Sequence, residues 1–213
     1  VHGVVPMSLA LSQSYNLSAV RLAQEFGLST FINHLQKFGV TSDIPSYPSI
    51  YLGAVDMSPM EVMNIYGNFA TGGFKYPVKS IRSVVDANGR SLERYSLSVQ
   101  PTIDPASAYA LNYGLQQVMS SGTGRSAYNS LPRNLNLAGK SGTTNDTRDS
   151  WFAGYSGNYM TVVWLGLDDN KVTGLTGSSG ALPVWTNVMK QLRQKPVNLA
   201  QPNEIEWHWL DRY

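Results

Sequence analysis

The chain has 213 residues, 42% of them hydrophobic and only 14% charged, which fits one folded globular domain or a large part of one. The net charge of +2 is small and scattered, and this argues against a nucleic-acid-binding protein. Cysteine is absent, so a disulfide framework and thiolate chemistry are excluded.

The three histidines, His2, His34 and His208, are too dispersed for a metal site, and we expect no metal or other cofactor. The best apolar stretch, residues 160–167, is much shorter than the roughly 18 residues of a membrane helix. The sequence begins at Val1 rather than at methionine, just ahead of a helical pattern. We therefore expect this chain to be part of something longer.

The first third of the sequence is predicted to be helical. Residues 6–13 form a short helix entered through a proline, and residues 17–26 and 29–38 form two more. Both of these end at a glycine, Gly27 and Gly39, the residue type most typical of helix ends.

The clearest helix signal follows a predicted loop at residues 41–51. In the sequence SPMEVMNIYGNFATGG, Ser58 is the expected cap and Pro59 the first helical residue. Glu61 completes a capping box, and Gly72-Gly73 ends the helix.

A hairpin and a second long helix come next. Residues 76–86 and 91–98 are predicted strands, with Asn88-Gly89 as a two-residue turn between them. Residues 105–121 carry apolar side chains at helical spacing.

Strands are then predicted at residues 135–141, 149–156 and 159–167, and a helix at residues 182–194. One face of that helix carries the apolar residues Val184, Trp185, Val188, Met189 and Leu192. Helices followed by antiparallel strands and a closing helix predict an α+β fold. The remaining tail contains Trp207 and Trp209, and we expect it to pack back on the same domain.

The segment Lys140-Ser141-Gly142-Thr143-Thr144 separates two predicted strands. A lysine ammonium and nearby hydroxyls suit a peptide carboxylate, and Gly142 leaves room for a substrate backbone along the strand edge. Taken alone, Lys-Ser-Gly is more typical of an ordinary turn. Asp146 and Arg148 flank the segment and are further candidates for substrate contact, whereas Asp149 is interpreted as structural.

A second polar segment, Ser14-Tyr15-Asn16, lies between two predicted helices, where a short loop can project side chains into a cleft. Taken alone, Ser14 or Asn16 is equally suited to capping the following helix. The two segments together are similar to the Ser-x-Asn and Lys-Thr/Ser-Gly motifs shared by penicillin-binding proteins and class A β-lactamases.

The context of these motifs is more specific. GTGR at residues 122–125 and LAGKSGTTNDTRDSWFAGYSG at residues 137–157 closely resemble the transpeptidase domain of class A (bifunctional) penicillin-binding proteins, of the type known as one-b. YLGAVDMSPMEVMNIYGNFATGG is similar to the helix that these proteins carry between the two motifs. The resemblance covers about residues 3–195.

The resemblance implies a β-lactamase/transpeptidase-like fold, with an antiparallel sheet flanked by helices and a helical subdomain. Residues 1–195 would be the C-terminal portion of the transpeptidase domain, and residues 196–213 a C-terminal tail. Ser14 would belong to a proton relay, and Asn16 would hydrogen-bond an amide of the bound stem peptide. Lys140 would support the relay electrostatically and help hold the terminal carboxylate.

The remaining implied roles concern substrate binding. Ser141 and Thr143 would bind the carboxylate, and the Thr143 N–H would form half of the oxyanion hole; Gly142 and Thr144 complete the expected set.

The family's nucleophile belongs to a Ser-x-x-Lys motif, which this sequence lacks. The nearest match, Ser18-Ala-Val-Arg21, ends in an arginine that cannot act as a base. The resemblance therefore places the nucleophile upstream of this chain.

The implied activity is that of a peptidoglycan DD-transpeptidase, which cross-links D-Ala-D-Ala stem peptides by serine acyl transfer and is acylated by β-lactams. The expected partners are these stem peptides, β-lactam antibiotics and the upstream portion of the enzyme, without which this chain should be inactive. The expected location is the periplasmic face of the bacterial inner membrane, reached through the full-length protein.

A β-lactamase and a non-catalytic module on the same fold are the alternatives. The GTGR and DSWFAGYSG segments favour the transpeptidase.

Overall fold

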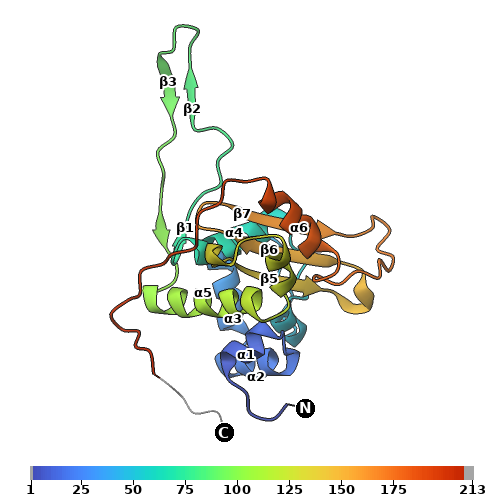
Figure 1. Cartoon of the computed structure of the whole chain (residues 1–213). Helices are drawn as coiled ribbons and strands as arrows, with labels where there is room; N and C mark the ends of the chain where they lie inside the picture. The colour runs from blue at the N-terminus through green and yellow to red at the C-terminus, as the bar shows by residue number, and fades with distance from the viewer. Residues whose placement is uncertain (1, 209–213) are drawn as a thin grey trace.

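The computed structural model describes residues 2–208, which have the expected α+β fold (Figure 1). The α-helices are α1 (Met7–Ser12), α2 (Asn16–Phe26), α3 (Leu28–Phe38), α4 (Pro59–Ala70), α5 (Pro105–Ser120) and α6 (Ala181–Lys190). The strands are β1 (Phe74–Lys75), β2 (Ser83–Val85), β3 (Ser91–Arg94), β4 (Gln100–Pro101), β5 (Ala138–Thr143), β6 (Ser150–Tyr155) and β7 (Met160–Leu165). Short 3₁₀ turns complete the description: η1 (Pro48–Leu52), η2 (Arg125–Asn129), η3 (Arg133–Leu135) and η4 (Asn145–Thr147).

The predicted helix ends are confirmed. Gly27 and Gly39 follow α2 and α3 with φ values of 80° and 108°, which a residue with a side chain rarely adopts. At the start of α4, Ser58 Oγ accepts a hydrogen bond from the Glu61 N–H at 3.3 Å, and the Glu61 carboxylate accepts one from the Ser58 N–H at 2.9 Å. This is the capping box that the sequence indicated.

The central sheet has the strand order β5-β6-β7, and both pairings are antiparallel. Side chains of β6 alternate between the two faces of the sheet. Phe152 packs against Trp185 of α6, whereas Tyr155 lies in a cluster with Leu115 of α5 and Tyr66 of α4. The sheet is therefore covered by α6 on one face and by α4 and α5 on the other (Figure 1).

The lysine motif lies inside β5, and the predicted boundaries 135–141 are wrong. Residues 133–135 form the 3₁₀ turn η3, and Asn136 has a left-handed φ of 48°, so the extended backbone begins only at Ala138. Lys140 through Thr143 consequently pair with β6 in a fixed register, with Lys140 opposite Ala153. The motif is part of a strand edge and not a turn.

Helix α6 is shorter than predicted, since it ends at Lys190. Trp185 and Met189 are fully buried, as expected for residues one turn apart on the face toward the sheet. Val184 and Val188 are 41% and 42% exposed, so their assignment to the same apolar face is wrong. Each lies one residue before a buried neighbour, and a helix rotates by about 100° per residue.

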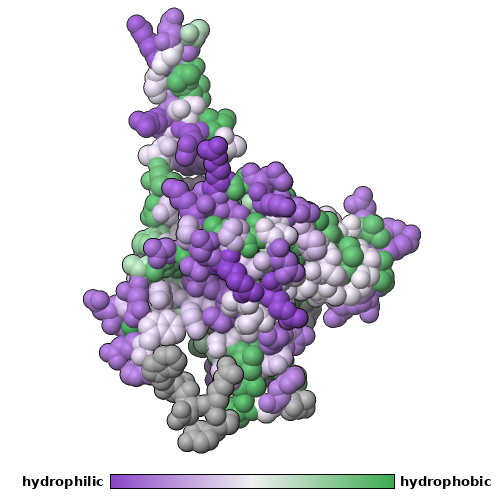
Figure 2. All heavy atoms as spheres, in the orientation of Figure 1, coloured by the Kyte–Doolittle hydropathy of each residue, from purple (hydrophilic) through white to green (hydrophobic). Residues whose placement is uncertain are grey.

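Residues 74–101 form an arm that projects away from the rest of the molecule (Figure 1). The arm is paired only near its base, by β1 and β4, and toward its tip, by β2 and β3. The predicted two-residue turn is longer, because the Asp86 N–H donates to the Arg90 carbonyl and Gly89 has a φ of 79°. Apolar side chains lie exposed along the arm (Figure 2), since an isolated two-stranded ribbon has no second layer to bury them.

The tail packs back on the domain as far as the structure describes it. Val197 is 5% exposed, and its N–H donates to the Leu135 carbonyl at 2.9 Å. The Trp207 ring meets the Tyr113 ring edge-on at a centroid distance of 4.8 Å. Trp209 lies outside the described residues.

A close approach between α1 and the loop after α5 positions the N-terminal helices. The Thr123 N–H donates to the Ser12 carbonyl at 3.2 Å. A Cβ atom on Gly122 would lie only 2.2 Å from that same carbonyl oxygen and 2.9 Å from the Val118 Cα. Only glycine allows the two backbones to meet at this distance.

Gly122→Ala should therefore destabilise the protein by about 1–3 kcal/mol, because the added methyl must push apart backbone atoms that cannot rotate away. Gly67→Ala is the matched control, since nothing lies within 4 Å of a Cβ added at that position of α4. The control should be neutral or stabilising by up to about 1 kcal/mol. Urea unfolding followed by circular dichroism measures both, and equal midpoints for the two variants would contradict the expectation.

Candidate active site

The structure brings Ser14 and Lys140 together although 126 positions separate them in the sequence. Lys140 Nζ donates a hydrogen bond to Ser14 Oγ at 2.7 Å and another to the Ser141 carbonyl at 2.9 Å. Ser14 lies in the turn between α1 and α2, and Lys140 projects from the middle of β5. This contact joins the helical part of the chain to the central sheet.

The turn that carries Ser14 is strained. Ser14 has a φ of 59°, in the left-handed region that residues with a Cβ seldom occupy. Hydrogen bonds from the Ser14 N–H to the Leu11 carbonyl and from the Tyr15 N–H to the Ala10 carbonyl hold it there. Neither Ser14 nor Asn16 caps α2 through its side chain. The capping alternative is therefore excluded, and the strain is of the kind that accumulates at functional sites.

Ser141 contacts a residue that lies outside the Ser-x-Asn and lysine motifs. Its Oγ lies 2.8 Å from Thr123 Oγ1, and the Ser178 hydroxyl donates to the Thr123 carbonyl at 2.9 Å. The only signal for Thr123 in the sequence was its position within the GTGR segment. Its proximity to the lysine motif depends on how the loop after α5 packs on β5.

The loop after β7 packs directly on the backbone of the lysine motif. The Gly177 N–H donates to Thr143 Oγ1 at 2.9 Å, and a Cβ on Gly177 would lie 2.7 Å from the Gly142 carbonyl oxygen. Because Thr143 accepts this bond, its hydroxyl proton remains available to a ligand. Thr143 is also exposed.

The Lys140 ammonium is half-buried, and desolvation lowers its pKa from 10.5 to about 8. Its partners, Ser14 Oγ and the Ser141 carbonyl, are uncharged. Among the ion pairs of residues 2–208, none involves Lys140. At neutral pH the group is therefore mostly protonated, and its charge is available to an anionic ligand.

These groups border a cleft of about 1000 Å³. Six of the predicted site residues line it: Asn16, Lys140, Ser141, Gly142, Thr143 and Thr144. Ser14 does not line the cleft itself but reaches it through its hydrogen bond with Lys140. The opposite wall is formed by the residues that precede α4.

Glu61 holds that opposite wall in place. Its carboxylate accepts hydrogen bonds from the N–H groups of Ser58, Thr41 and Ser42 at 2.8–2.9 Å and from the hydroxyls of the same three residues. The N–H of Ser58 contributes most, and together these donors hold the pKa of the Glu61 carboxyl well below its ordinary value. Glu61 is only 7% exposed, so this network is a buried anchor between the 41–42 segment and α4.

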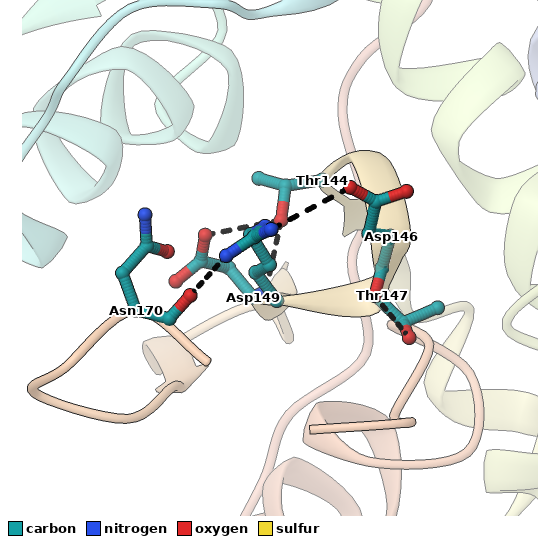
Figure 3. Close-up of polar contacts among 6 residues, drawn as sticks. Thr144, Asp146, Thr147, Asp149 and Asn170 are labelled. Atoms are coloured by element: carbon teal, nitrogen blue, oxygen red, sulfur yellow. Dashed lines mark hydrogen bonds and ion pairs between the residues drawn. The ribbon is translucent and has the colours of Figure 1, made fainter. Parts of the chain in front are cut away.

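The outer end of the cleft is a loop of residues 144–149, between β5 and β6 (Figure 3). Thr144 Oγ1 donates to the Asp149 carboxylate at 3.0 Å and accepts from the Asp149 N–H at 2.8 Å. The same carboxylate accepts from Trp164 Nε1 at 2.9 Å. The interpretation of Asp149 as structural is thus confirmed by its contacts, and the Thr144 side chain faces this loop.

The arrangement suits the binding of a carboxylate-ended peptide. It combines a half-buried ammonium, two hydroxyls and a strand, β5, that pairs only with β6 in the described part of the chain.

Residues 2–208 contain no cluster of acidic or histidine side chains suited to a metal ion. In the same range, no helix combines the length and hydropathy needed to cross a membrane.

Comparison with known proteins identifies the relatives of this chain. Residues 1–190 match the family model of the penicillin-binding protein transpeptidase domain. The chain is 39% identical to penicillin-binding protein 1B of Vibrio cholerae and 35% identical to penicillin-binding protein 1B of Escherichia coli. Both alignments cover 95% of the present chain. It spans 26% and 24% of these two relatives, respectively.

Solved structures show the same fold at lower identity. Penicillin-binding protein 1A from Haemophilus influenzae superposes with a TM-score of 0.86 at 24% identity, over 94% of this chain and 36% of that one. The penicillin-binding protein PonA1 from Mycobacterium tuberculosis gives a TM-score of 0.79 at 21% identity, over 93% and 60% of the two chains. The β-lactamase/transpeptidase-like fold expected from the motifs is confirmed.

Replacement of Glu61 tests the cleft wall. Glu61→Gln should lower stability at pH 7 by about 1–3 kcal/mol, because it removes the charge from a buried network of donors. Since the folded-state pKa is depressed, the contribution of Glu61 is present above the ordinary pKa of 4.5 and is lost as the pH falls below it. The stability difference between wild type and variant should therefore shrink below about pH 4.5.

Urea midpoints measured from pH 7 to pH 3 provide the check. Glu25→Gln, at an exposed position of α2, is the control and should change stability by no more than about 0.5 kcal/mol. A difference for Glu61→Gln that stays constant down to pH 3 would show that the charge of Glu61 contributes nothing.

Proposed function

Because this chain belongs to the family of penicillin-binding protein transpeptidase domains, we propose that it forms the substrate cleft of a serine-type peptidoglycan DD-transpeptidase. The observation that carries the proposal is the contact of 2.7 Å between Lys140 Nζ and Ser14 Oγ, next to the hydroxyls of Ser141 and Thr143. A proton-transfer pair and a carboxylate-binding strand then share one cleft.

The carboxylate of the terminal D-alanine binds in this proposal to the hydroxyls of Ser141 and Thr143 and to the charge of Lys140. Gly142 lets the peptide backbone pair with the edge of β5, and Asn16 hydrogen-bonds a peptide amide from the opposite side. The Thr143 N–H provides half of the oxyanion hole. Thr144 acts through Asp149, which it contacts directly, to shape the outer part of the site.

The reaction is an acyl transfer in two steps. The nucleophilic serine Oγ attacks the carbonyl between the two D-alanines, its proton passes to the departing amine, the C–N bond breaks, and an ester forms. An amine of a neighbouring stem peptide then attacks the ester, loses a proton to the serine oxygen, and forms the cross-link. Ser14 relays the proton in both steps, and Lys140 stabilises the negative charge that develops beside it.

The nucleophile itself comes, in this proposal, from a Ser-x-x-Lys motif in a portion of the enzyme that precedes these 213 residues. The absence of that motif from the sequence supports this. So does the length of the relatives, of which the chain spans about a quarter. The whole enzyme would act at the periplasmic face of the inner membrane on peptidoglycan stem peptides, and β-lactams would acylate the same serine.

Location of the acyl group tests the proposal most directly. We expect fluorescent penicillin to label the longer protein covalently, and peptide mapping to find the label outside the residues of this chain, because no serine here has the lysine that activates it. The control is a variant with the upstream serine replaced by alanine, which should not be labelled. A label on any serine of this chain would disprove the assignment of the nucleophile.

Replacement of Lys140 tests its role. Lys140→Ala in the longer protein should slow acylation by penicillin at least ~100-fold, the scale of losing one preorganised electrostatic group. Because the pKa of Lys140 is about 8, acylation should also decline as the pH rises past 8 and the ammonium loses its proton. Lys140→Arg keeps its charge at that pH, so this decline should be absent from its profile. Wild-type acylation rates in Lys140→Ala would rule out the role.

A further inference from the structure

The loop of residues 144–149, at the outer end of the cleft, has a strained backbone immediately before Arg148. Asp146 and Thr147 have φ values of 58° and 53°, a conformation that is especially unfavourable for a β-branched residue such as threonine. The Thr147 carbonyl accepts two hydrogen bonds from Thr173, from its N–H at 3.0 Å and from its hydroxyl at 2.6 Å. These bonds tie the loop to the segment that follows β7 and fix the residue after Thr147, which is Arg148.

Two contacts orient the guanidinium of Arg148. Its Nη1 donates to the Asn170 carbonyl, and its Nη2 lies 3.7 Å from the Asp146 carboxylate. Figure 3 labels both of these partners. A guanidinium has five N–H donors, so most of them are not used by these partners. The side chain of Arg148 is 40% exposed and borders the cleft.

The ion pair with Asp146 is weak enough to admit a ligand. Asp146 is 69% exposed, and an exposed pair at this distance contributes little. The Asp149 carboxylate, the other acid of this loop, already accepts from Trp164 and Thr144. Arg148 therefore has no strong anionic partner in the described residues, while its position is fixed in advance.

The charged residues around the cleft indicate that Arg148 and Lys140 bind different groups of a ligand. Of the described residues that border the cleft, Lys140 and Arg148 carry positive charge, and Asp56, Glu61 and Asp149 carry negative charge. Lys140 is assigned to the terminal carboxylate in the proposed function. Arg148 is then the remaining cation of the cleft.

The direction of β5 places Arg148 beside the upstream part of a bound peptide. Ala138 and Gly139 at the start of β5 are buried, so a ligand strand can pair only along the stretch from Lys140 onward. A peptide that pairs antiparallel with this edge ends near Lys140 and Ser141. Its preceding residues then extend past Thr143 toward the 144–149 loop.

We propose that Arg148, held by Asn170 and Asp146 at the cleft mouth, is a specificity-determining residue that binds a second carboxylate of the donor stem peptide, upstream of the terminal D-alanines. This inference rests on the proposed function and adds to it the residue that distinguishes donor peptides with an acidic side chain near their D-Ala-D-Ala end from donor peptides without one. A guanidinium can donate two parallel N–H bonds to the two oxygens of a carboxylate. A carboxamide has only one oxygen and no charge, so it cannot accept both bonds in the same way.

The test uses the longer protein and synthetic donor peptides ending in D-Ala-D-Ala, which carry either glutamate or glutamine at one of the two preceding positions. For the better position, wild type should prefer the glutamate peptide roughly 3- to 10-fold in kcat/KM, mainly through a lower KM, as for one solvent-accessible charged pair. Arg148→Gln should abolish the preference, and Arg148→Lys should keep part of it. Lys171→Gln, which removes an exposed positive charge from the neighbouring segment outside the cleft, is the control and should keep the preference in full.

A purely structural role for Arg148 gives a different result. If Arg148 only fastens the two loops, Arg148→Gln should lower kcat for both peptides equally and leave their ratio at the wild-type value, which would overturn the proposal. The proposal would also be overturned if the change from glutamine to glutamate altered kcat/KM only when it is made in the acceptor peptide and not in the donor peptide. Acylation by fluorescent penicillin, measured in parallel, separates this outcome from failure of the proposed function, in which wild type itself would not be labelled.

Discussion

The site depends on the placement of one half-buried ammonium group. Lys140 lies 2.7 Å from the Ser14 hydroxyl, and desolvation lowers its pKa to about 8. This position requires that the turn after α1 meets the middle of β5, which in turn requires the close backbone approach of Ser12 and Gly122. The packing of α1 on α5 therefore sets the geometry of the Ser14–Lys140 pair.

The walls of the cleft are fixed by polar contacts whose partners come from different segments of the chain. Glu61 ties the 41–42 segment to α4 on one side, and Gly177 and Thr173 tie the segment after β7 to the lysine motif and its loop on the other. These contacts hold the two walls of the cleft in one arrangement, because each of them joins segments that are far apart in the sequence. The strained φ values at Ser14, Asp146 and Thr147 all occur around this cleft. Their cost is offset by these surrounding hydrogen bonds.

Local chemistry explains why many elements could be predicted. Gly27, Gly39 and the Ser58–Glu61 capping box act over a single turn of helix, so the sequence alone indicates them. The same reasoning failed where the outcome depends on distant partners. The predicted start of β5 is wrong because Leu135 lies in a 3₁₀ turn whose carbonyl accepts from the distant Val197 N–H, and a left-handed Asn136 follows it. Val184 and Val188 are exposed because the sheet selects which face of α6 is buried.

By itself, the sequence determined the fold class, the family and the identity of the polar groups in the cleft, because these follow from local patterns and from motifs of a few residues. Only the tertiary structure decided which groups meet. Thr123 approaches Ser141, and Arg148 is oriented at the cleft mouth by Asn170, through contacts between residues 18 and 22 positions apart. Contacts of this kind arise from the packing of loops against the sheet, and short-range sequence patterns carry no information about that packing.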